Sequence, residues 1–157
     1  MADELADRIA AFLDAHEVMS LATIGAQGPH AANLFYARDA MALVWVSDPA
    51  SRHSLELAAD ARAAATIAHD AADVAAIRGV QLSGRAQRVS DPTARAVAQR
   101  VLEARFPFLR QTADTALRDN YQRAAIYRLD IERVVLIDNS RGFAHKEVLD
   151  LGRSGAG

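Results

Sequence analysis

The chain has 157 residues, of which 51% are hydrophobic and 24% charged, as expected for one soluble globular domain with a sizeable core. A net charge of −2 provides no basic surface for nucleic acid or an anionic membrane, and no apolar run is long enough to cross a bilayer. The absence of cysteine excludes disulfides, iron–sulfur clusters and thiolate zinc sites, and it fits a cytoplasmic protein.

The first half of the chain predicts a helix, three strands and a second helix. Residues 3–16 carry apolar side chains at helical spacing, and their acidic start lacks the pattern of a signal peptide. Short polar turns separate three apolar runs, which predict an antiparallel meander over residues 18–24, 30–37 and 40–47. A helix is predicted to begin after Pro49 and to end near Asp60.

The second half predicts more strands with helices inserted between them. Strands are expected over residues 62–69, 74–89, 124–129, 132–137 and 148–151. A helix is expected from Ser90-Asp91-Pro92 to Phe106-Pro107, with a short one at 112–120. Within the long strand the polar side chains fall on one face, which is expected to meet solvent, and they are Gln81, Ser83, Arg85 and Gln87. Gly79 and Gly84 indicate a bulge or a close approach of another backbone.

These elements predict a mainly β protein with inserted helices, a six-stranded antiparallel split β-barrel. Residues 1–151 are expected to form this single domain, and residues 152–157 a flexible tail. No His-Glu-x-x-His or other ligand spacing links the five histidines, so no metal site is predicted.

The segment from Ser47 to Leu55 predicts a phosphate site. A strand ends there and a helix begins, with Ser47, Ser51, Arg52 and His53 around the exposed N–H groups of the helix start. Ordinary capping is the alternative interpretation, because Asp48 with Pro49 is a common start signal and Ser51 could cap instead.

Four motifs in register resemble the FMN-binding split-barrel family whose type member is pyridoxamine phosphate oxidase, and most closely a small bacterial branch of it. They are Asn33-Leu34-Phe35-Tyr36, the run from Ser47 to His53, Ile77-Arg78-Gly79-Val80-Gln81, and Asp138-Asn139-Ser140-Arg141-Gly142-Phe143. The resemblance implies a homodimer that binds FMN between its subunits and acts on a small-molecule substrate as a flavin-dependent oxidoreductase. The part played by the segment from Asp138 to Lys146 is left open.

The resemblance also implies the cofactor-binding residues. Asn33, Leu34 and Phe35 would lie along the flavin ring, and Ser47, Ser51, Arg52 and His53 would hold the phosphate. Gln81 would stand in for the glutamine at the flavin edge. The type enzyme has Arg-Lys where this chain has Arg52-His53, so phosphate affinity is expected to depend on pH.

Other readings stay open at this point. The Arg-x-His pair that holds the oxidase substrate has no counterpart here, so vitamin oxidation is not expected. A deazaflavin coenzyme could replace FMN, the chain could bind heme through His145, or it could be a non-catalytic flavin-binding protein. No residue is identified as a catalytic acid or base.

Overall fold

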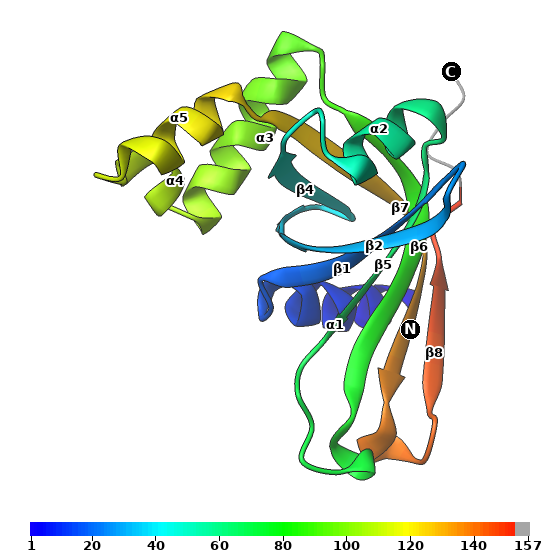
Figure 1. Ribbon diagram of the computed structural model, residues 1–157. Coiled ribbons are helices and arrows are strands. Elements are labelled where there is room, and N and C mark those ends of the chain that lie inside the picture. The colour runs from blue at the N-terminus through cyan, green and yellow to red at the C-terminus, as the bar shows by residue number, and fades with distance from the viewer. Residues whose placement is uncertain (153–157) are drawn as a thin grey trace.

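A strongly curled antiparallel sheet forms the centre of the computed structural model, which describes residues 1–152 (Figure 1). Its eight strands are β1 (Val18–Gly25), β2 (Gly28–Phe35), β3 (Ala37–Asp39), β4 (Ala42–Ser47), β5 (Arg62–Ala68), β6 (Arg78–Arg88), β7 (Ala125–Asp138) and β8 (Lys146–Asp150). They follow the order β2-β1-β5-β6-β7-β4-β3, and β8 pairs with β7 beside this path. The sheet is therefore a half-barrel.

The two edges of the sheet are consecutive in the sequence. β2 forms one edge and β3 the other, and Tyr36 alone joins them. The Tyr36 backbone N–H donates to the Glu17 carbonyl at 3.0 Å, and its buried hydroxyl donates to the Leu13 carbonyl at 2.6 Å. A chain that passes from one edge to the other through one residue requires the sheet to curl until its edges approach each other.

The helices lie at three places around the sheet. They are α1 (Ala2–Asp14), α2 (Arg52–Ala59), α3 (Pro92–Arg105), α4 (Phe108–Gln111) and α5 (Thr115–Arg123), with two 3₁₀ turns, η1 (Val74–Ala76) and η2 (Asn139–Arg141). Helices α3–α5 form an arm beside the sheet, and α2 covers one end of it (Figure 1). Asp91 begins α3 because its side chain accepts from the Ala94 N–H at 2.8 Å, followed by Pro92 in the first turn. Arg8 ties α1 to β8 through two hydrogen bonds to the Glu147 carboxylate, at 2.9 and 2.7 Å.

Two hydrophobic cores lie on the two faces of β4. The main core lies inside the curled sheet and includes Trp45, Leu129, Leu21 and the α1 residues Ile9 and Leu13. The second core lies between the sheet and α3, and it contains Val44, Ala98, Leu102, Phe106 and Ile126 among others. Side chains alternate along a strand, so the position of Trp45 in the main core places Ser47 on the same face.

The predicted number of six strands was wrong, and so was the predicted three-strand meander. The run at 30–37 divides into β2 and β3 at Tyr36, whereas the runs at 124–129 and 132–137 form the single strand β7. β4 pairs with β3 and β7 instead of β2. Burial explains this placement, because the side chains of Val44 and Trp45, on opposite faces of β4, are both fully buried.

The long strand predicted at 74–89 begins later, because Asp73 caps the 3₁₀ turn η1 through a bond from the Ala76 N–H at 3.0 Å. The close approach predicted at Gly84 is confirmed. A β-carbon there would lie 2.0 Å from the Asp130 carbonyl oxygen, beside a register shift between Ser83 and Gly84. Residues 153–157 of the predicted tail lie outside the described residues.

Within residues 1–152, no helix combines the length and the apolar character needed to span a membrane.

Candidate functional site

The turn between β4 and α2 brings the end of a strand beside the start of a helix. The Asp48 carboxylate accepts from the Ala50 N–H at 2.8 Å, and the Ser51 N–H donates to the Asp48 carbonyl at 3.0 Å. The chain therefore reverses within four residues after Ser47. This reversal brings together three of the residues predicted to bind phosphate, Ser47, Ser51 and His53.

A cluster of one imidazole and three hydroxyls forms here, called the Ser–His cluster below: Ser47, Ser51, His53 and Ser54. His53 Nε2 lies 2.5 Å from Ser47 Oγ and 3.1 Å from Ser51 Oγ. The Ser51 hydroxyl donates to Ser54 Oγ at 2.8 Å. Ser47, His53 and Ser54 are all buried, with exposed fractions of 9%, 8% and 3%. The ring and the hydroxyls are thus held in defined positions before any ligand binds.

The start of α2 has no side-chain cap. Ser51 occupies the N-cap position, but its hydroxyl bonds to His53 and Ser54 and not to the helix backbone. Asp48, the other predicted cap, is used within the turn. The first N–H groups of α2 therefore have no side-chain acceptor, and they point toward the region where an anion would be favoured.

Arg52 stands at this helix start, but its guanidinium already has a partner. Its Nε donates to Glu56 Oε1 at 2.6 Å, one helical turn away, and the other Glu56 oxygen accepts from Thr23 Oγ1 at 2.8 Å. These two bonds, led by the bond from Arg52, lower the pKa of the Glu56 carboxyl. The Arg52 side chain is 40% exposed, so it can turn toward a ligand at the cost of this pair.

His30 was missed by the sequence analysis although it faces the cluster from β2. Its ring lies parallel to that of His53, with an angle of 7° between the planes and 6.5 Å between the centroids. Burial lowers the pKa of His53, and the nearby His30 lowers it further, while Glu56 raises it. The alternation of β2 could have indicated His30, since it shares a face with the predicted residue Leu34, which packs against the main core.

A cleft of about 620 Å³ adjoins Ser47. Val46, Ser47 and Asp48 form one wall, and Leu117 and Arg123 of α5 belong to the other. The Arg123 guanidinium donates to Asn120 Oδ1 at 3.0 Å, and among residues 1–152 no carboxylate lies within ion-pairing distance of it. Arg123 is therefore a second cation beside the site, and the sequence analysis did not identify it.

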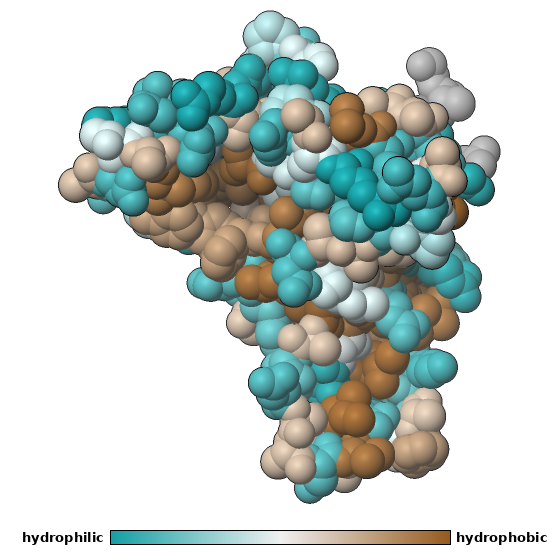
Figure 2. Space-filling view, viewed as in Figure 1, coloured by the Kyte–Doolittle hydropathy of each residue, from teal (hydrophilic) through white to brown (hydrophobic). Residues whose placement is uncertain are grey.

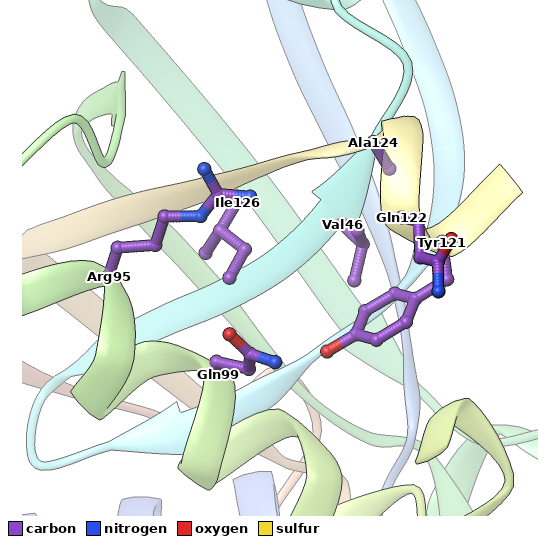
Figure 3. Close-up of a pocket in the computed structure, with 7 residues that line it drawn as sticks. All are labelled: Val46, Arg95, Gln99, Tyr121, Gln122, Ala124 and Ile126. Carbon is purple, nitrogen blue, oxygen red and sulfur yellow. The ribbon is translucent and has the colours of Figure 1, made fainter. Parts of the chain in front are cut away.

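A smaller pocket of about 210 Å³ shares Val46, Tyr121 and Ala124 with this cleft. Figure 3 shows Arg95 and Gln99 on α3 and Tyr121 on α5 around a floor that includes Val46 and Ile126. The Tyr121 hydroxyl donates to Glu103 at 3.1 Å, and burial, with the nearby Glu103, raises the pKa of Tyr121 to about 12. Tyr121 therefore stays neutral at ordinary pH and borders both cavities.

Two further predicted residues, Asn33 and Gln81, lie elsewhere, on the outer face of the sheet. The register aligns Asn33 with Ser20, Ser20 with Thr66, and Thr66 with Gln81, so the four side chains form a polar row across β2, β1, β5 and β6. The Ser20 hydroxyl donates to Asn33 Oδ1 at 2.7 Å. Within one chain the structure does not bring this row to Ser47, which faces the opposite side of the sheet.

Phe35 also lies on the outer side and is 54% exposed. Its ring meets Phe106 edge-on at 5.5 Å, and Phe106 lies 5.8 Å from the exposed Phe108. Figure 2 shows apolar side chains gathered in the hollow beneath the arm of α3–α5. This side of the molecule therefore offers both an apolar hollow and the polar row.

His145, the residue considered for heme, lies between η2 and β8, at the end of the molecule away from α2 (Figure 1). Its Nε2 is 3.5 Å from Glu147 Oε2. Within residues 1–152, no three side chains of the histidine or acidic types gather as a metal site would require. A heme ligand at His145 would therefore be remote from the Ser–His cluster of the same chain.

Comparison with known proteins identifies the family. The family model described as pyridoxamine 5′-phosphate oxidase matches residues 5–138. A UPF0306 protein of Serratia proteamaculans is 30% identical over 141 residues, which cover 88% of this chain and 90% of that protein. The structure of a heme-binding protein of Mycobacterium smegmatis is 25% identical with a TM-score of 0.72, covering 96% of this chain and 58% of that one. An FAD-binding protein of Mesorhizobium loti has the same fold, with 20% identity, a TM-score of 0.62, and coverage of 82% and 91% of the two chains. This chain belongs to the pyridoxamine 5′-phosphate oxidase family.

Proposed function

We propose that this protein binds FMN, holds its phosphate at the start of α2, and works as a flavin-dependent oxidoreductase on a small molecule. The observation that carries the proposal is the uncapped N-terminus of α2 beside the hydroxyl of Ser47, at the mouth of a cleft of about 620 Å³. A cleft of this size is within the range of cofactor sites.

The residues at the site fit a phosphate group. Backbone N–H groups of α2 and the Ser47 hydroxyl supply donors, and Arg52 and Arg123 supply positive charge. When bound, the flavin would supply hydride transfer, and the protein would supply position and hydrogen bonds. Tyr121, neutral and at the border of the smaller pocket, would face a substrate placed next to the ring.

A homodimer completes the proposed site. The outer face of the sheet carries small side chains such as Ala31, Ala64 and Ala68, together with exposed Phe35 and Val18. A second copy of the chain would cover this face and enclose the polar row of Asn33 and Gln81. The flavin would then lie between the subunits, with its phosphate on α2 of one of them.

Heme is the second candidate, because the heme-binding protein of Mycobacterium smegmatis resembles this chain along 96% of its length. FMN is preferred because the donors gather at a helix start, where a phosphate is stabilised and a porphyrin has nothing equivalent to offer. A deazaflavin coenzyme, which also carries phosphate, would use the same donors.

The visible spectrum of the purified protein, before and after FMN is added and excess removed, tests the proposal. Flavin bands in stoichiometric amount would support it, and their reduction by a nicotinamide or other donor would support oxidoreductase activity. A Soret band with no retained flavin would favour heme. A flavin that binds but is never reduced would favour the non-catalytic alternative.

A further inference from the structure

Each serine hydroxyl of the Ser–His cluster has one proton to donate, and this limit sets the direction of the hydrogen bonds. Ser51 gives its proton to Ser54 Oγ at 2.8 Å. At its 3.1 Å contact with His53, the Ser51 oxygen must therefore accept. It follows that His53 Nε2 carries hydrogen.

The same Nε2–H lies 2.5 Å from Ser47 Oγ. Ser47 accepts from the ring, so its own proton remains free to bond outside the cluster. Ser47 lines the cleft, where that proton can meet a ligand. If Nε2 lacked hydrogen, Ser47 would donate to the ring and would present only lone pairs to the cleft, which repel an anion.

We propose that His53 is a positioning residue that keeps the Ser47 hydroxyl oriented as a donor toward the phosphate, and that His53 does not itself contact the phosphate. The inference rests on the proposed function and deepens it, because the sequence alone assigns His53 directly to the phosphate. A positive ring is not required, since a neutral ring with Nε2–H donates in the same way. Around the ring stand His30 from β2, Glu56 from α2, and Arg52, which is paired with Glu56.

The tautomer can be measured without any cofactor. In ¹⁵N-histidine NMR of the cofactor-free protein above the ordinary histidine pKa, the signal lost in His53→Gln identifies His53. We expect its Nε2 to be protonated and its Nδ1 to be bare. A bare Nε2 would overturn the inference.

A double-mutant cycle separates positioning from direct contact. The quantity measured is the preference for FMN over riboflavin, which lacks the phosphate. Ser47→Ala is expected to reduce this preference by about tenfold, the effect of one hydrogen bond to a charged group. His53→Leu is expected to reduce it in the native background and to have no further effect in Ser47→Ala. His53→Gln, whose side-chain amide can donate, is expected to keep most of the preference.

The outcomes distinguish the inference from the proposed function. Additive effects of His53→Leu and Ser47→Ala would mean that His53 contacts the phosphate, and only the inference would fail. A native protein with no preference for FMN over riboflavin would contradict the proposed function itself. If His53→Leu does not fold, His53→Gln and the NMR measurement still decide the matter.

Discussion

Arg52 shows how one residue can serve both the fold and the site. Its guanidinium is paired with Glu56 at 2.6 Å, and Glu56 is also held by Thr23. An arginine placed in this way contributes to phosphate binding only after it leaves or shares its carboxylate partner. The net gain is therefore smaller than for an arginine with no partner.

Arg52→Ala is accordingly expected to weaken FMN binding by about 1–2 kcal/mol, because a charged hydrogen bond is lost at a partly exposed position. Riboflavin binding should be unchanged. Calorimetric titration of the variant with both ligands measures the difference. Equal losses for the two ligands would show that Arg52 acts through the fold alone. Glu56→Gln is the matched variant, and it should strengthen FMN binding because it releases the guanidinium.

His53 predicts a pH dependence of stability in the cofactor-free protein. Its pKa in the folded state lies below the ordinary value of about 6.5, mainly because the ring is buried. As pH falls through the ordinary value, the unfolded chain binds a proton that the folded chain does not, so the free energy of unfolding decreases. The decrease ends below the lowered pKa, and above the ordinary value this contribution is constant.

Urea denaturation of the native protein and of His53→Gln between about pH 5 and pH 8 measures this effect, because glutamine does not titrate. We expect the native protein to lose more stability than the variant on acidification. Parallel curves for the two proteins would mean that His53 titrates equally in both states.

At the scale of the element, local signals in the sequence were sufficient wherever a turn determines the structure. The α3 boundaries follow from Asp91 and Pro92, and the association of Ser47 with the start of α2 follows from the short turn between them. Contacts between distant elements could not be predicted in this way. Thr23 reaches Glu56 across 33 residues, and Arg123 reaches the cleft from α5. For the same reason the pairing of β4 with β7 was missed.

Gly84 is the position where an element depends most directly on one residue. A β-carbon there would meet the Asp130 carbonyl oxygen at 2.0 Å, which is backbone and has little freedom to move. Gly84→Ala is expected to destabilise the protein by about 2–4 kcal/mol, through strain between β6 and β7. Chemical denaturation measures the loss, and Ser83→Ala on the exposed face should change stability by less than about 0.5 kcal/mol. A fully stable Gly84→Ala would contradict the close approach.

At the scale of the whole molecule, the outer face of the sheet predicts association. A charge placed on it, as in Ala64→Glu, is expected to dissociate the dimer and to weaken flavin binding at the same time. Analytical ultracentrifugation with and without FMN measures both effects. Arg100→Glu, on the exposed side of α3, is the control and should remain dimeric. A native protein that is monomeric with FMN bound would contradict the shared site.

The bonds between Arg8 of α1 and Glu147 of β8 join positions 139 residues apart. At ordinary translation speeds, roughly ten seconds separate the emergence of these two segments from the ribosome. During that interval the apolar stripe of α1, including Ile9 and Leu13, lacks part of its final surroundings. The fold is therefore completed only after nearly all of the chain has been synthesised, and until then α1 is the natural point of contact for a chaperone.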